Sequence, residues 1–190
     1  MTNYRRMYIP NATWFFTVNL AERKNNRLLV EQITHLRQAF RSITQRHPFT
    51  IDAIVVLPDH LHCLWTLPAG DADYSTRWNV LKGYFSRTIA KGESRTESRQ
   101  GKRERGLWQR RFWAHWITDA ADFNRHVDYI HWNPVKHGWA KRVADWPYSR
   151  FHRFVRPGVY PVDWGVADAV DFETGEYMQR VTRVRWCGAA

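Results

Sequence analysis

Cysteine is scarce in this sequence, because Cys63 and Cys187 are the only two among 190 residues. They are far apart and lack metal-type spacing, which argues against a disulfide framework and fits a reducing compartment. Long apolar runs are lacking as well: no apolar signal core follows the first residues, and no stretch reaches membrane-spanning length. These absences predict a cytoplasmic protein without a membrane segment.

Acidic residues are outnumbered, with 18 Asp and Glu against 29 Lys and Arg, a formal net charge of +11 and a pI near 10.1. A positive field of this size favours polyanionic partners, although basic proteins also arise for other reasons. The 11 tryptophans add to this, since indole rings stack on unpaired bases, while most large aromatics pack in cores. The length fits one domain with a real core.

Hydrophobic patterns predict the order strand, helix, strand, strand, helix, strand, followed by a further helix. The predicted segments are strands over 14–20, 51–57, 60–67 and 112–117, a helix over 30–46, a helix capped by Ser75 or Thr76, and a helix from Asp119 or Asp122 to Asn133, before Pro134. This order is that of a ferredoxin-like α+β sandwich, an antiparallel sheet with helices on one face.

Basic residues concentrate in two places. Arg77 and Lys82 lie largely off the apolar stripe of the second predicted helix, and we predict that both bind nucleic acid. Residues 92–106 contain no apolar residue, which predicts a solvated, mostly basic and mobile loop. No repeat or domain-scale linker is present, so we expect one domain over 1–165 and a C-terminal tail over 166–190.

Two histidines one residue apart offer metal ligands. His60 and His62 share one face of their predicted strand, because side chains alternate along a strand. Two imidazoles at this spacing can converge on one ion; the alternative is a pair of solvent-facing histidines on a hairpin. The motif alone decides little, because short motifs match often by chance.

Tyr129 and Asn133 lie one turn apart on the last predicted helix. Asn133 offers a carbonyl oxygen as a third metal ligand and Tyr129 offers a nucleophile. The alternative is that Tyr129 packs in the core and Asn133 ends a helix before a proline. His126 and Lys136 are nearby candidates for a general base, and either is as well suited to contact phosphate or solvent.

A tyrosine nucleophile and a set of metal ligands are needed together for one reaction. The ordinary pKa of a phenol is about 10, so Tyr129 needs a neighbouring divalent cation that polarises a phosphodiester and offsets the developing negative charge. Attack by the phenolate would form a covalent phosphotyrosine. Imidazole ligands suit manganese, whereas magnesium prefers oxygen, so we expect Mn²⁺ or Mg²⁺ that retains several waters.

Five sequence blocks resemble REP-associated tyrosine transposases, a group within the HUH superfamily that is related to single-strand insertion-sequence transposases. The blocks lie at residues 4–9, 14–20, 56–68, 127–139 and 145–152. The resemblance implies a ferredoxin-like fold and a single-stranded DNA substrate that carries a REP hairpin. It further implies cleavage to a 5′-phosphotyrosine and a free 3′-hydroxyl, rejoining by the reverse reaction, and action as a monomer.

The resemblance also implies residue roles. His60 and His62 would be the histidine pair of the HUH motif, Tyr129 the single catalytic tyrosine and Asn133 the helix-borne metal ligand. The N-terminal segment helps to recognise DNA in this group, which implies DNA binding by Tyr4, Arg5 and Arg6.

The basic loop over 92–106 is longer than is usual in this group. It either grips the hairpin backbone or is a tolerated insertion. The tail after Asp168 is too divergent for any residue of the group to be matched.

Two other functions remain open at this point. A hydrolytic nuclease would keep the metal and leave Tyr129 structural; a covalent adduct distinguishes the two enzymes. A non-catalytic protein would bind REP hairpins through charge and stacking alone. The complete set of His60, His62, Tyr129 and Asn133 favours an enzyme.

Overall fold

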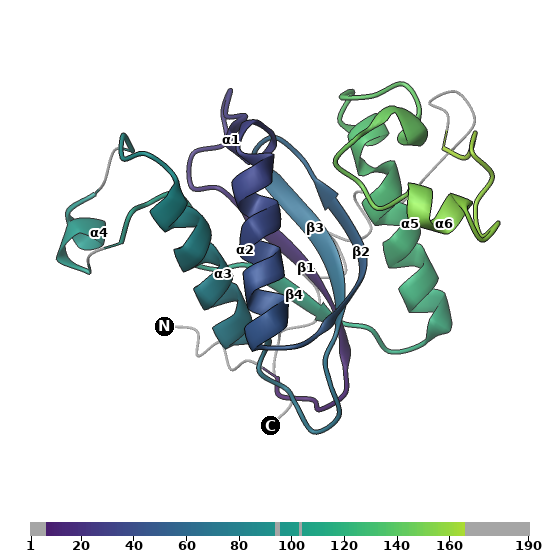
Figure 1. Ribbon diagram of the computed structural model, residues 1–190, viewed down its shortest axis with the longest axis horizontal. Helices are drawn as coiled ribbons and strands as arrows, with labels where there is room; N and C mark the ends of the chain where they lie inside the picture. Colours follow the sequence, from purple (N-terminus) through teal and green to yellow (C-terminus); the bar gives the residue numbers. More distant parts are fainter. Residues whose placement is uncertain (1–6, 94–95, 103, 166–190) are drawn as a thin grey trace, which may run out of the picture. The chain divides into compact units, whose positions relative to one another are not determined.

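The computed structural model describes residues 7–93, 96–102 and 104–165 (Figure 1). Tyr4, Arg5, Arg6 and the expected tail therefore lie outside the described residues. The chain divides into two compact units. The first extends to His131 and includes Tyr148–Arg150; the second comprises Trp132–Pro147 and the described residues from Phe151 onward.

A four-stranded antiparallel sheet in the order β2-β3-β1-β4 forms the centre of the first unit. The strands are β1 (Thr13–Asn19), β2 (Thr50–Val56), β3 (His60–Thr66) and β4 (Trp113–Trp116). With the helices inserted between β1 and β2 and between β3 and β4, this is the predicted ferredoxin-like arrangement. The tight turn between β2 and β3 is closed by a hydrogen bond from the Leu57 N–H to the His60 carbonyl, 2.8 Å.

Six α-helices and one 3-10 helix occur among the described residues. They are α1 (Leu28–Glu31), α2 (Ile33–Arg46), α3 (Tyr74–Thr88), α4 (Glu97–Gly101), α5 (Ala120–Lys136), the 3-10 helix η1 (Val143–Asp145) and α6 (His152–Val155). Helices α2 and α3 pack side by side against one face of the sheet (Figure 1). On that face Trp65 of β3 stacks on Trp78 of α3, with ring centroids 4.2 Å apart. This aromatic contact anchors α3 to the sheet.

The opposite face of the sheet is covered by the first part of α5, where we had expected helices on one face only. Phe15 of β1 contacts His126 of α5, with ring centroids 4.7 Å apart. The adjacent Phe16 points to the other side and contacts Trp78 of α3. Both phenylalanines are fully buried, which a sheet covered on one face would not allow for consecutive residues. The sheet is therefore a middle layer within this unit, and the first part of α5 presents His126 and Tyr129 to the face that carries Phe15.

Two helix ends differ from those predicted. Helix α3 begins earlier than expected, because Asp73 is its cap and accepts a hydrogen bond from the Thr76 N–H, 2.9 Å. Helix α5 does not end at Asn133 but continues through Pro134 to Lys136. The His137 N–H still reaches the Asn133 carbonyl, 3.1 Å, so the helical hydrogen bonds resume beyond the proline.

The expected loop over 92–106 contains the short helix α4 and makes specific contacts. The Arg105 guanidinium binds the Glu93 carboxylate at 2.6 Å and the Ile89 carbonyl at 2.7 Å. The bonds to the Ile89 carbonyl and to the Ala90 carbonyl satisfy groups just past the end of α3, so Arg105 acts as a C-terminal cap for that helix. Part of the segment is thus tied to α3, in contrast to the freely solvated loop predicted.

The second unit has a small core of its own. Val135, Val143 and Phe151 are buried in it, and Tyr160 and Trp164 pack around Phe151. Across the described part of both units, no helix is long and apolar enough to cross a membrane.

Candidate functional site

The two predicted metal-binding histidines lie side by side on β3. His60 and His62 pair with Asn19 and Thr17 of the central strand β1. The centroids of the two rings are 5.0 Å apart, and the ring planes are nearly perpendicular. Both residues are about 5% exposed. The predicted shared face is therefore present, but both histidines are buried, with the Tyr129 ring beside His62, and the face is not a solvent-facing hairpin surface.

Hydrogen bonds orient both imidazole rings through their Nδ1 atoms. Nδ1 of His60 lies 2.6 Å from the Asp59 carboxylate, which also accepts a hydrogen bond from Arg23. Nδ1 of His62 lies 2.9 Å from the Thr17 hydroxyl. Although burial raises the pKa of Asp59, the hydrogen bonds from His60 and Arg23 prevail and lower it to about 2. Asp59 is therefore an anion at neutral pH, and its negative charge favours a donating Nδ1–H on His60.

Tyr129 faces the same site from the first part of α5. Its ring centroid lies 5.2 Å from that of His62 and 6.0 Å from that of Phe15. The structure thus brings His60, His62 and Tyr129 together across the interface between β3 and α5. Asn133 follows one turn later on the same helix and is fully buried; it belongs to the second unit.

Arg77 and Lys82 lie on α3, which covers the other face of the sheet. The side chain of Arg77 is 4% exposed, and its guanidinium binds the Asp71 carboxylate at 2.6 Å and the Asp73 carbonyl at 2.8 Å. Lys82 is half-buried, and its ammonium donates to the Gln109 carbonyl, 3.1 Å. Arg77 is engaged inside the protein, so we leave it out of the proposed nucleic-acid interface.

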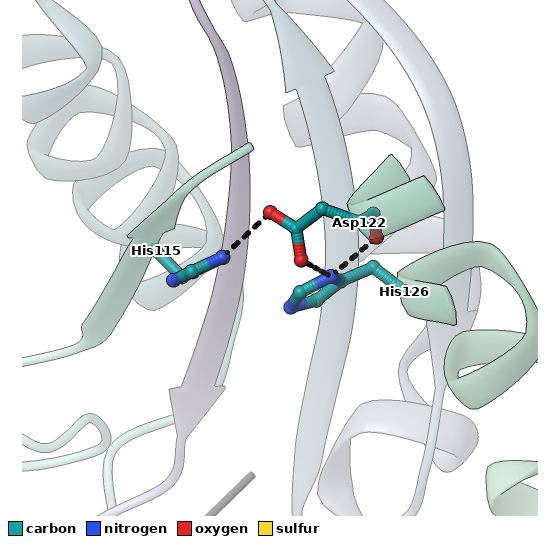
Figure 2. A group of neighbouring side chains, drawn as sticks. All are labelled: His115, Asp122 and His126. Atoms are coloured by element: carbon teal, nitrogen blue, oxygen red, sulfur yellow. Dashed lines mark hydrogen bonds and ion pairs between the residues drawn. The ribbon is translucent and has the colours of Figure 1, made fainter. Parts of the chain in front are cut away.

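A second group of ionisable side chains joins β4 to α5 (Figure 2). Nε2 of His115, on β4, lies 2.9 Å from the Asp122 carboxylate. Nδ1 of His126 lies 3.2 Å from the same carboxylate. One potential ligand atom from each of these three residues lies within 4.8 Å of the others. From the sequence, Asp122 was predicted only as a possible helix start, and His126 as a candidate base that is as well suited to contact phosphate or solvent. The i, i+4 spacing of Asp122 and His126 was the available signal, but the approach of His115 depends on how β4 meets α5.

The donor set around β3 fits a divalent ion. The Nδ1 atoms of His60 and His62 are held by Asp59 and Thr17, so coordination would use the Nε2 atoms of both rings. A carboxylate or hydroxyl behind a ligating imidazole is the usual support for such a ligand. Imidazole pairs suit manganese and later transition metals.

Comparison with known proteins supports a class of enzyme. On this sheet a histidine pair of β3 lies beside a tyrosine of α5. The sequence model of the family described as "Transposase IS200 like" matches residues 14–133. The HUH-type transposases generally use a divalent metal ion.

Individual relatives agree. The chain is 48% identical to the REP-associated tyrosine transposase of Escherichia coli (strain K12), over 93% of this chain and 98% of that protein. It is 46% identical to a protein named as a putative REP-associated tyrosine transposase of Haemophilus influenzae (strain ATCC 51907 / DSM 11121 / KW20 / Rd), over 87% and 94%. A solved structure of a REP-associated tyrosine transposase bound to a REP hairpin matches with a TM-score of 0.75 and 47% identity, over 91% of this chain and 96% of that one.

The chain therefore belongs to the IS200-like transposase family and, within it, to the REP-associated tyrosine transposases. Members of this group are enzymes that act on single-stranded DNA with a tyrosine nucleophile.

Proposed function

We propose that this protein cleaves and rejoins single-stranded DNA at REP-type hairpins, with Tyr129 as the nucleophile. The observation that carries the proposal is the approach of Tyr129 to His62, with ring centroids 5.2 Å apart, beside His60. The similar structure bound to a REP hairpin supports the choice of substrate.

In the cleavage step the Tyr129 phenolate oxygen attacks the scissile phosphorus. The bond from phosphorus to the 3′ oxygen breaks, and that oxygen takes up a proton and leaves as a 3′-hydroxyl. The 5′-phosphate stays on Tyr129, so the energy of the phosphodiester is retained. In the reverse step a 3′-hydroxyl attacks the phosphotyrosine and releases the phenol, which rejoins the strands.

The proposed metal is Mn²⁺ or Mg²⁺, held by His60 and His62. Bound there, it would supply Lewis-acid polarisation of the phosphate and charge neutralisation. Asp59 and Thr17 orient the two imidazoles, and the buried setting of both rings limits competing water. Asn133 remains our predicted third ligand, on the basis of the sequence.

DNA binding outside this centre is proposed for Tyr4, Arg5, Arg6 and Lys82. The net charge of +11 supports contacts of this kind with the phosphate backbone. We further propose that the protein acts as a monomer in the cytoplasm, since His60, His62 and Tyr129 meet within one chain and the two cysteines suit a reducing compartment.

A denaturing protein gel tests the proposal directly. The purified protein is incubated with a labelled single-stranded REP hairpin and with Mn²⁺, Mg²⁺ or a chelator. We expect a metal-dependent covalent band that Tyr129→Phe abolishes and that Tyr84→Phe, a matched change on α3, leaves intact. Cleavage without a covalent band would favour a hydrolytic nuclease. Hairpin binding without either reaction would identify a non-catalytic binding protein, and the proposal would be wrong.

A further inference from the structure

We propose that His115, Asp122 and His126 form a hydrogen-bonded clasp between β4 and α5 that positions Tyr129 against His62. The inference rests on the proposed function and makes these three residues positioning residues. Figure 2 shows both imidazole rings directed at the one carboxylate between them.

Asp122 is the centre of the clasp, because its carboxylate accepts hydrogen bonds from both elements. One oxygen accepts from His115 Nε2 at 2.9 Å and from the Thr118 N–H at 3.1 Å. The other lies 3.2 Å from Arg125 and 3.2 Å from His126 Nδ1. The side chain of Asp122 is only 8% exposed, so these bonds form in a partly desolvated site where they are strong.

The hydrogen bonds also fix which nitrogen of His126 carries the proton. Its Nδ1 lies 2.8 Å from the main-chain carbonyl of Asp122, which only accepts, so Nδ1 must donate. Burial lowers the pKa of His126 to about 4, which keeps the ring neutral at pH 7. A proton on Nδ1 prevents that atom from binding a metal ion. The Nδ1 side of His126, which faces Asp122, is therefore occupied by hydrogen bonds, and the buried Nε2 has no hydrogen-bond partner among the described residues.

A series of ring contacts connects the clasp to Tyr129. The rings of His115 and His126 stack with centroids 4.8 Å apart and an interplanar angle of 15°. His126 then packs on Phe15, and the same Phe15 ring contacts both Tyr129 and His62. Residues 126 and 129 are neighbours on one helix face. A shift of α5 away from β4 would therefore move Tyr129 relative to His62.

Conservative and truncating variants of His115 test whether the hydrogen bond to Asp122 positions Tyr129. In His115→Gln the amide nitrogen replaces Nε2 as a donor to Asp122, whereas His115→Ala removes the donor. We expect His115→Ala and Asp122→Ala to lower the rate of adduct formation about 10- to 100-fold at saturating hairpin and Mn²⁺. Hairpin affinity should not change, and His115→Gln should remain close to the wild type. His35→Gln on α2 is the matched control.

Two results would overturn the clasp. One is a wild-type rate of adduct formation in both alanine variants. The other is stoichiometric zinc binding by His60→Ala/His62→Ala protein that the further change His115→Gln abolishes. That result would assign the group as a metal site, because glutamine keeps the hydrogen bond but not the imidazole ligand.

Hydrogen exchange keeps the two proposals distinguishable. If the wild type forms no adduct, the proposed function fails, while the clasp is still tested by amide exchange of residues 123–131. We expect faster exchange in Asp122→Ala and unchanged exchange in His115→Gln. Unchanged exchange in Asp122→Ala would overturn the clasp whatever the fate of the proposed function.

Discussion

The carboxylate of Asp59 lies 2.6 Å from Nδ1 of His60, the residue that directly follows it in the chain. The other carboxylate oxygen lies 2.6 Å from Nε of Arg23. The tight turn before β3 therefore places a charged group where it fixes the rotation of the first histidine. Thr17 does the same for His62 from the adjacent strand, with a hydroxyl in place of a carboxylate.

The hydrogen bonds that Asp59 and Thr17 make with the two imidazoles should affect the affinity of the site for a metal ion. We expect Asp59→Asn to weaken Mn²⁺ binding about 10- to 100-fold, because the imidazole of His60 loses its anionic partner and becomes a poorer and less oriented ligand. Thr17→Val should weaken binding in the same direction. Calorimetric titration with Mn²⁺ measures both. Glu31→Gln, which removes an exposed carboxylate on α1, is the control. Wild-type affinity in both test variants would show that the histidine pair is not the metal site.

Two buried histidines of α5 should make folding stability depend on pH. Burial lowers the pKa of His126 to about 4 and that of His131 to about 3, from 6.5. As the pH falls from 6.5 towards 4, these two histidines bind protons in the unfolded chain but stay neutral in the folded chain. The free energy of unfolding should therefore decrease by about 1.4 kcal/mol per pH unit for each histidine, and these two histidines should add no slope above pH 7.

Urea unfolding at pH 7, 6 and 5 measures this slope. The variant His131→Asn keeps a polar partner for the Ser149 hydroxyl but does not titrate, so the slope should lose the share of one histidine. An identical slope in wild type and variant would contradict the assignment of a depressed pKa to His131.

Arg77 should contribute to stability and not to DNA binding. We expect Arg77→Lys to lower the free energy of unfolding by about 3 kcal/mol, since a lysine cannot reproduce the fork that binds Asp71 and the neighbouring carbonyls. Arg87→Lys, on the exposed side of the same helix, is the control. Urea unfolding and hairpin titration are the two measurements. Weaker hairpin binding with unchanged stability in Arg77→Lys would restore the interface role predicted from the sequence.

Local patterns predicted most of the fold. The strand predicted after the turn at Pro58 and Asp59 and the helix predicted from the spacing of Leu36, Phe40 and Ile43 depend on local sequence, and both elements are present. Pro134 misled the prediction of the α5 end, because a proline weakens a helix without always ending it. The cover on the second sheet face was missed, since a short aromatic run such as 14–16 does not show whether one face or both are buried.

The site was partly accessible from the sequence. The spacing of His60 and His62 and that of Tyr129 and Asn133 each follow from one element, so their local arrangement was predictable. The residues that hold these side chains in place could not be predicted. Thr17 reaches His62 only through the register of β1 and β3, and His115 reaches Asp122 only through the packing of α5. Arg77 looked exposed by its helical position, but its guanidinium also donates to the carbonyls of His47 and Pro48, which are distant in the sequence.

Mass spectrometry of the covalent adduct tests the central claim most directly. After reaction with a short REP hairpin and Mn²⁺, nuclease and trypsin digestion should leave a nucleotide on the peptide of residues 126–136, in which Tyr129 is the only tyrosine. The account predicts a nucleotide linked through its 5′-phosphate to Tyr129. A nucleotide on another residue, or cleaved DNA with no modified peptide, would contradict Tyr129 as the nucleophile.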